Sequence, residues 1–435
     1  MSPIMSPVQH RGPLSAKSGR AANGALVLAI VLVSAVLATR PAQAQTFKVL
    51  YKVLYSFQGS PDGGDAVAPL VRDAKGNFYG TTNEGGTGGC LDYGCGIVFK
   101  VAPNGSETVL YSFQGSTDGA FPTAGLVRDT SGNLYGTTSW SWDYGPGTVF
   151  KLAPNGNFTV LYTFTGGADG EGPEGTLVRD AAGNFYGATY YGGSNACYDE
   201  NQYGCGVVFK LTPSGKLRVL YTFAGYPTDG ANPAAGLVRD AAGNLYGTTE
   251  HGGAYHDGVV FKLDKSGKET VLYSFQDGAD GGFPAADLVL DAEGNLYGTT
   301  PEGGSSGCNG FGCGVVFKLD KAGKLTVLHS FAGYPKDGET PYAGLVMDTA
   351  GNLYGTTELG GSYGCFGTYG CGAIFRVNKA GKETVLYSFT GGDDGVQPFA
   401  DLILDKAGNL YSTASFGGTG TWGTVFKLTP KHDGE

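Results

Sequence analysis

The chain has 435 residues, and its 39 acidic side chains outnumber its 29 basic ones, for a formal net charge of −10. This excess of negative charge argues against binding to a phosphate backbone, so we expect no nucleic-acid partner. Glycine is abundant, with 77 residues, but aromatic residues still reach 12% of the chain. That aromatic content excludes a disordered glycine-rich polymer and indicates a packed fold.

The first 44 residues have the pattern of an export signal. Arg11, Lys17 and Arg20 precede an apolar run over residues 25–38, and residues 42–44 read Ala-Gln-Ala. The run is short for a membrane span, and small residues at a cleavage site follow it. We predict a signal peptide over residues 1–44, cleaved after Ala44, and therefore a secreted, periplasmic or cell-surface protein. A retained N-terminal anchor is the alternative. No membrane span is expected after signal removal, because no second apolar run follows.

From about residue 47 to residue 428, one pattern recurs seven times, and residues 236–275 show it most clearly. Four segments rich in β-branched and aromatic residues lie at 237–240, 244–249, 258–263 and 270–275, and we name them strands A, B, C and D of a repeat. The short A–B and C–D links each carry a glycine suited to a tight hairpin. No segment has apolar residues at helical spacing. Each repeat is therefore predicted to form a four-stranded antiparallel sheet.

The repeat length indicates how these sheets are assembled. Successive D strands start 51 to 59 residues apart, which is typical of the blades of a β-propeller. The mature chain begins with a strand D at residues 46–57 and ends with a strand C at residues 423–428. We therefore predict an all-β, seven-bladed β-propeller of four-stranded antiparallel blades, closed by the N-terminal strand completing the last blade. Residues 45–430 are assigned to this single domain, and residues 431–435 to a short polar tail.

Two motifs return in the repeats, G-L-V-x-D-x-x-G-N-L-Y-G-T-T and G-x-V-F-K-L. They resemble the repeats of the choice-of-anchor tandem repeat GloVer-containing proteins, over nearly all of the chain after residue 44. The resemblance implies an exported bacterial protein with a propeller-like repeat plan, and it implies no defined activity. Members of that family end in different anchors, so the resemblance does not predict how residues 431–435 would attach to a surface.

Features present in every repeat are interpreted as structural. An Asp-Gly pair in each D–A link is assigned to a turn rather than to calcium, because no repeat supplies a dense set of oxygen ligands. The tyrosine of strand B is expected to pack between blades, at Tyr79, Tyr135, Tyr186, Tyr246, Tyr297, Tyr354 and Tyr411. Arginines in strand A of the first four repeats are expected to pair with an acid of the neighbouring blade, or to line the channel: Arg72, Arg128, Arg179 and Arg239.

The eight cysteines fall in pairs, and each pair lies within one B–C link. An exported chain with two or no cysteines per link favours local disulfides over a zinc site, which would need four converging ligands. The predicted disulfides are Cys90–Cys95, Cys197–Cys205, Cys308–Cys313 and Cys365–Cys371.

The B–C and D–A links are long and variable, and in a propeller they emerge on the same face, where we place any ligand site. Aromatic residues three positions before strand C recur in six repeats and are expected to pack at the loop base. Unrepeated aromatic residues are the candidates for stacking on a ligand, although they could equally fill loop cores. The candidates are Trp140, Trp142, Tyr190, Tyr191, Tyr198, Phe366, Phe416 and Trp422.

No residue set forms a catalytic signature, and no catalytic residue, metal or cofactor is assigned. His251 and His256 could join Glu250 and Asp257 at a metal, but their spacing fits no standard motif. His329 stands where the other D strands have tyrosine. We expect a monomeric, non-enzymatic binding or interaction propeller with a polysaccharide or protein ligand. The alternatives are a carbohydrate-active lyase or hydrolase, which needs two facing carboxylates, and a purely structural surface protein.

Overall fold

The computed structural model describes residues 49–90, 93–115, 117–139, 145–193, 197, 203–304, 307–365 and 369–430. Contacts divide the chain into two units, residues 1–46 and 47–435, and every described residue belongs to the second. The predicted signal peptide and the tail at 431–435 therefore lie outside the described residues. Within the described ranges, no helix is long and apolar enough to cross a membrane.

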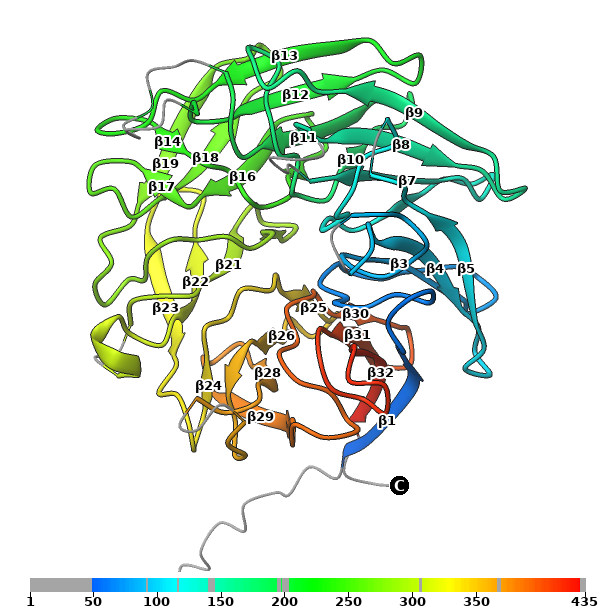
Figure 1. The fold of residues 1–435 in the computed structure, drawn as a ribbon. Coiled ribbons are helices and arrows are strands. Elements are labelled where there is room, and N and C mark those ends of the chain that lie inside the picture. The colour runs from blue at the N-terminus through cyan, green and yellow to red at the C-terminus, as the bar shows by residue number, and fades with distance from the viewer. Residues whose placement is uncertain are drawn as a thin grey trace, which may run out of the picture. The chain divides into compact units, whose positions relative to one another are not determined.

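Seven four-stranded antiparallel sheets follow one another around a ring (Figure 1). The first four are blade 1, with β2 (Val71–Arg72), β3 (Phe78–Thr82), β4 (Ile97–Val101) and β5 (Glu107–Ser112); blade 2, with β6 (Val127–Arg128), β7 (Leu134–Thr138), β8 (Thr148–Leu152) and β9 (Phe158–Thr163); blade 3, with β10 (Val178–Arg179), β11 (Phe185–Thr189), β12 (Val207–Leu211) and β13 (Leu217–Thr222); and blade 4, with β15 (Val238–Arg239), β16 (Leu245–Thr249), β18 (Val259–Leu263) and β19 (Glu269–Ser274).

The remaining three sheets complete the ring. They are blade 5, with β20 (Val289–Leu290), β21 (Leu296–Thr300), β22 (Val315–Leu319) and β23 (Leu325–Ser330); blade 6, with β25 (Val346–Met347), β26 (Leu353–Thr357), β28 (Ala373–Val377) and β29 (Glu383–Ser388); and blade 7, with β30 (Ile403–Leu404), β31 (Leu410–Ala414), β32 (Thr424–Pro430) and β1 (Val49–Ser56). In the links, β14 (Gly230–Ala231) pairs with β17 (His251–Gly252), β24 (Gly338–Glu339) pairs with β27 (Leu359–Gly360), and Cys308–Gly310 form a single 3₁₀ turn, η1.

Ring closure follows the predicted scheme. The N-terminal strand β1 pairs with β32 from Val49 opposite Pro430 to Ser56 opposite Thr424, with one irregularity between Val53 and Tyr55. Figure 1 shows the blue first strand beside the red last one. The seven-bladed all-β propeller and its closure are confirmed.

Strand B carries a glycine in six of the seven blades, with Ser412 in the seventh, because the core leaves little room for a side chain there. A Cβ on Gly247 would lie 2.8 Å from Leu237 Cδ2 and 2.9 Å from Phe261 Cζ. The ring of Phe261, on strand C of blade 4, in turn meets Phe223 of blade 3 edge to face at 5.1 Å. The repeated Tyr-Gly-Thr and Val-Phe-Lys segments thus build the packing between consecutive blades.

Every A–B turn contains the same hydrogen-bonded aspartate. In blade 4, Asp240 Oδ1 accepts from the Asn244 backbone N–H at 2.8 Å, and Asp240 Oδ2 accepts from Asn244 Nδ2 at 2.6 Å and from the Tyr246 hydroxyl at 3.2 Å. Burial raises the pKa of Asp240, but these hydrogen bonds outweigh it and leave that pKa below its ordinary value. The strand B tyrosines also pack between blades as expected, since Tyr411 lies 4.7 Å from Phe78 of the next blade.

The aspartates of the D–A links are also turn residues, as predicted, but with different partners. Asp229 Oδ2 accepts from the Tyr221 hydroxyl of strand D at 2.8 Å and from the Ala224 backbone N–H at 2.7 Å. Asp229 Oδ1 also accepts from the Gly230 N–H at 2.7 Å, so the bonded backbone groups do not lie two residues after the aspartate. The bond with the strand D tyrosine, or with His329 in blade 5, ties each D–A link to the strand that precedes it.

Three of the four strand A arginines contact the neighbouring blade, whereas Arg179 lies 5.9 Å from the ring of Phe185 in its own blade. Arg72 pairs with Asp405 of blade 7 at 3.8 Å and lies over the Tyr411 ring. Arg128 and Arg239 lie over the strand B tyrosine of the preceding blade, each 5.7 Å from the ring centroid. The expectation of an acid partner is thus confirmed for Arg72, whereas Arg128 and Arg239 meet an aromatic ring.

Candidate functional site

The B–C and D–A links form one face, where the disulfides hold the two kinds of link together. All four predicted disulfides are present, with Cα–Cα distances from 4.9 to 5.3 Å. They also contact the following D–A link, because a Cβ on Gly225 would lie 3.0 Å from Cys205 Sγ and one on Gly333 would lie 2.6 Å from Cys308 Sγ. The scaffold of this link face is therefore cross-linked and closely packed.

Exposed aromatic side chains gather on the link face. Within the described ranges, every aromatic residue that is strongly exposed lies in a B–C or D–A link: Tyr93, Tyr226, Tyr255, Phe311, Tyr342, Tyr363, Tyr369 and Phe416. Their exposed fractions run from 39% to 65%, with Phe311 the highest. We call these eight residues the aromatic rim.

Four of these side chains correct the expectation that the repeated link aromatics pack at the loop base. Tyr93, Tyr255, Phe311 and Tyr369 are each more than 40% exposed. The base of several links is filled instead by the disulfide and by pairing of glycine backbones, such as Gly303 with Gly312. Backbone and sulfur atoms occupy the interior of these links, so the aromatic ring of the link is left exposed to solvent.

The predicted ligand residues lie in different surroundings. Tyr190 and Tyr191 lie together in a cavity, and Phe416 is exposed on the rim. Trp422 packs against the backbone of Gly59 and Gly64, so it fills a loop core, which was the alternative interpretation. The other four candidates lie outside the described residues: Trp140, Trp142, Tyr198 and Phe366.

The cavity has a volume of about 350 Å³ and lies among the links of blades 3 and 4. Its aromatic walls make close ring contacts with one another. Tyr226 stacks on His256 at 3.7 Å with an interplanar angle of 14°, and Tyr190 meets Tyr191 at 4.7 Å and 75°. Asn232 and Asp257 add polar groups to the lining. Such a cavity, apolar with a few polar groups, is typical of a small-ligand site.

The cavity residue Tyr190 contacts one half-buried glutamate, Glu250, and a second glutamate, Glu174, interacts electrostatically with Glu250. The Tyr190 hydroxyl donates to Glu250 Oε2 at 2.6 Å, and the Tyr190 backbone carbonyl accepts from Asn232 Nδ2 at 3.1 Å. Burial, and then the negative charge of Glu250, raise the pKa of Glu174 to about 7. Burial also raises the pKa of Glu250, against the hydrogen bond from Tyr190. Two neighbouring carboxylates therefore titrate at unusual pH, a pattern often found in functional sites.

Among the described residues, His251, His256, Asp257 and Glu250 do not bring their ligand atoms together into one cluster, and three of them make other contacts. Glu250 binds Tyr190, His256 stacks on Tyr226, and His251 meets Phe283 at 5.4 Å. Burial, followed by the nearby His256, also lowers the pKa of His251. The arrangement is an aromatic wall and not a set of converging ligands.

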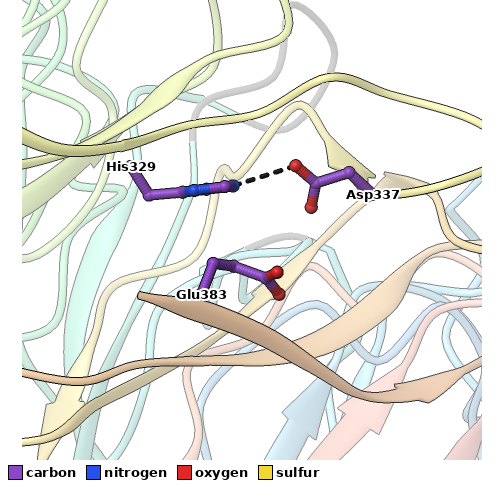
Figure 2. A group of neighbouring side chains, drawn as sticks. All are labelled: His329, Asp337 and Glu383. Atoms are coloured by element: carbon purple, nitrogen blue, oxygen red, sulfur yellow. Dashed lines mark hydrogen bonds and ion pairs between the residues drawn. The ribbon is translucent and has the colours of Figure 1, made fainter. Parts of the chain in front are cut away.

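Sequence reasoning missed a different cluster. Among the described residues, one group of three His, Asp or Glu side chains has its ligand atoms within 4.8 Å of one another: His329, Asp337 and Glu383 (Figure 2). The available signal was a histidine where the other D strands have tyrosine. The cluster forms only because Glu383, from the next blade, lies close to His329 and Asp337.

A repeat-family model matches the sequence over residues 42–199 and again over residues 196–368, and its description is "Gloeobacter/Verrucomicrobia repeat". The chain belongs to this family. Together the two matches span more than half of the chain, and they agree with the motifs noted above. No curated protein matches the sequence.

Two solved structures with low sequence identity are similar to this chain. The extracellular domain of a B. thetaiotaomicron protein assigned to a one-component system is 10% identical, with a TM-score of 0.50 over 86% of this chain. The present chain spans 39% of that structure's length. A luciferin-regenerating enzyme is 14% identical, with a TM-score of 0.42 over 70% of this chain and 90% of its own. Likeness at these identities concerns the fold alone. The four disulfides themselves indicate a location outside the reducing cytosol.

Proposed function

We propose that this protein is a non-enzymatic polysaccharide-binding propeller, and that the link face is its binding surface. The observation that carries this proposal is the aromatic rim, whose strongly exposed rings all lie in B–C and D–A links. Large exposed apolar groups gathered on one face of a soluble protein usually mark an interaction site. Aromatic rings offer flat apolar surfaces on which the C–H face of a sugar ring can stack.

The cavity supplies the part of the site that would select a sugar. The Tyr226–His256 stack and the Tyr190–Tyr191 pair provide aromatic walls, and Asn232 and Asp257 provide polar groups for hydroxyls. Its volume of about 350 Å³ fits one or two sugar units. The other residues of the aromatic rim on the same face would then hold the rest of a longer chain. A purely structural protein would have no need of such a surface.

The test is binding of the mature protein, residues 45–435, to a panel of cell-wall and plant polysaccharides by affinity electrophoresis. We expect selective retention. Replacing Tyr226 or Tyr191 by alanine should weaken binding about tenfold each, since one stacked ring contributes about 1.4 kcal/mol. No retention on any polysaccharide would overturn the proposal and favour a protein partner or a structural role.

Tyr363→Ala is the matched control. Tyr363 is 52% exposed in the B–C link of blade 6, and it does not line the cavity. As a rim residue outside the cavity it would contact only the more distant part of a polysaccharide chain, so the same chemical change there should weaken affinity less than Tyr226→Ala does. Equal losses in the Tyr363 and Tyr226 variants would mean that the cavity is not the selective site.

A second candidate function, a hydrolase or lyase acting on the bound polysaccharide, is favoured by Glu174 and Glu250. A carboxylic acid with a pKa of about 7 beside a second carboxylate has the protonation states that glycosidic-bond cleavage requires. Slow release of reducing ends or of unsaturated sugars, abolished by Glu174→Gln while binding persists, would support this activity. Release that continues in Glu174→Gln would exclude Glu174 as the acid.

We also infer that residues 1–44 direct export and are removed after Ala44. The basic and apolar segments with Ala42-Gln43-Ala44 support this inference. N-terminal sequencing of the protein recovered from an expressing bacterium should begin at Gln45, and a first residue at position 1 would contradict it. Sedimentation of the same sample is expected to show a monomer.

A further inference from the structure

Three side chains from two consecutive blades converge beside the outer strands of blades 5 and 6 (Figure 2). His329 lies on β23, Asp337 in the link that follows, and Glu383 at the start of β29. His329 Nε2 is 2.9 Å from Asp337 Oδ2, and the side chains are only 19% and 10% exposed. The Glu383 carboxylate points toward this pair, and its Oε1 atom is buried and has no hydrogen-bond partner in the structure.

The orientation of Asp337 is already determined by the backbone. Its Oδ1 accepts from the Gly338 N–H at 2.7 Å, and its Oδ2 accepts from the Ala332 N–H at 3.1 Å. The His329 ring stands edge to face against Phe331 at 4.8 Å. Groups held in this way lose little conformational freedom when they bind an ion, which favours affinity.

The repeat supplies two comparison sites at other blade boundaries. Tyr221, Asp229 and Glu269 occupy the equivalent positions between blades 3 and 4, and Tyr55, Asp62 and Glu107 those between blades 7 and 1. In both, the tyrosine hydroxyl donates to the aspartate, and the glutamate again has an unpartnered Oε1. The site of blades 5 and 6 differs from them by having an imidazole nitrogen in place of a hydroxyl.

We propose that His329, Asp337 and Glu383 bind a divalent transition-metal ion of the zinc class, which links blade 5 to blade 6. One imidazole and two carboxylates are a ligand set that such ions accept, with water in a fourth position. The ion would offset the repulsion between the two carboxylates and give the unpartnered Glu383 oxygen a ligand.

The geometry requires only small movements. Ligand atoms bound to zinc at about 2.0–2.2 Å lie roughly 3.3 Å apart in a tetrahedral site. The His329–Asp337 pair would open from its hydrogen-bonded 2.9 Å, and the Glu383 carboxylate would approach by rotation of its side chain. Metal binding requires the tautomer of His329 that leaves Nε2 without a proton, because a ligating imidazole nitrogen carries none.

The first experiment measures zinc binding to the mature protein, without a histidine tag and after chelator treatment, by titration calorimetry and by metal analysis after dialysis. We expect one equivalent of Zn²⁺ in the wild-type protein and none in His329→Tyr. That variant restores the residue found at the equivalent positions, so it should fold. Zinc at 100 times its dissociation constant should raise the folding equilibrium constant about 100-fold in wild type only. Undiminished zinc content in His329→Tyr would overturn the proposal.

The comparison site allows a test by gain of function. Tyr221→His completes a second set with Asp229 and Glu269, and the zinc content should rise to two equivalents. His256→Ala in the wild-type chain controls for zinc binding at other histidines, and this variant should keep one equivalent of zinc. A Tyr221→His protein that melts at the wild-type temperature and still binds one equivalent would show that histidine does not decide binding, and would overturn the assignment of the ligands.

Discussion

The A–B turn side and the link side of the blades differ in how much their sequences vary from repeat to repeat. On the A–B turn side, all seven repeats carry the same aspartate, asparagine and tyrosine network, as seen at Asp240, Asn244 and Tyr246. On the link side, neighbouring repeats differ in length, in disulfides and in aromatic content. The A–B turn side is constant because each copy has the same packing requirement. The link side can vary because the sheet that carries it is already stable, and variable links can form a binding surface.

The largest effect is expected from breaking the ring itself. A chain that begins at residue 58 lacks β1, so β32 becomes an unpaired edge and the buried Phe57 is lost. We expect loss of cooperative unfolding and aggregation through the open edge. Circular dichroism melting and light scattering would test this. A monomer with a cooperative transition would show that closure by β1 is dispensable.

A smaller loss is expected from one constant turn. Asp240→Ala removes the acceptor for Asn244 and Tyr246 and should lower the free energy of unfolding by about 1–2 kcal/mol. Urea denaturation followed by fluorescence would measure it. Asp264→Ala, at the exposed C–D turn of the same blade, is the control and should have less effect. A larger loss in Asp264→Ala would contradict the structural weight given to the A–B network.

Stability should depend on pH in two opposite ways. Hydrogen bonds, against the effect of burial, hold the pKa of turn aspartates such as Asp240 below its ordinary value, so their contribution is present above about pH 4 and is lost as the pH falls through the folded pKa. Burial, and then a nearby aspartate, raise the pKa of Glu107 and Glu269 to about 7, so their contribution is present below the ordinary value and is lost as the pH rises through 7.

Together these shifts predict a maximum in melting temperature near pH 5. Calorimetry from pH 3 to 8.5 would show a decline on both sides of it. The Glu107→Gln and Glu269→Gln double variant should make the decline on the alkaline side shallower, while other buried carboxylates such as Glu174 keep part of it, and should leave the acid side unchanged. A wild-type melting temperature that is constant from pH 5 to 8.5 would mean that these glutamates titrate normally.

The smallest effect is expected on the rim. Phe311→Ala removes a ring that is 65% exposed and should change the free energy of unfolding by less than about 0.5 kcal/mol. Phe317→Ala, in β22 of the same blade, removes a fully buried ring and should cost about 3–5 kcal/mol. Chemical denaturation of both variants would compare them. Similar losses would mean that the rim contributes to the core and has no separate role.

The fold was predictable because its information is repeated. Seven copies of one pattern identify strands, turns and glycine positions, and the order of the first and last strands implies the closure by β1. The disulfides were predictable for a related reason, since both partners lie within one link. Local geometry allows few other pairings over such short separations.

The candidate sites required the tertiary structure. Tyr190 meets Glu250 across 60 residues, and Glu383 reaches His329 from the next blade. Pattern within a repeat says nothing about such meetings, because they depend on which unrepeated side chains neighbouring blades place opposite each other. Exposure of the rim was equally hidden, since backbone and sulfur occupy the loop interior. By itself the sequence determined the propeller and its four disulfides, whereas packing between blades decided which side chains share a site.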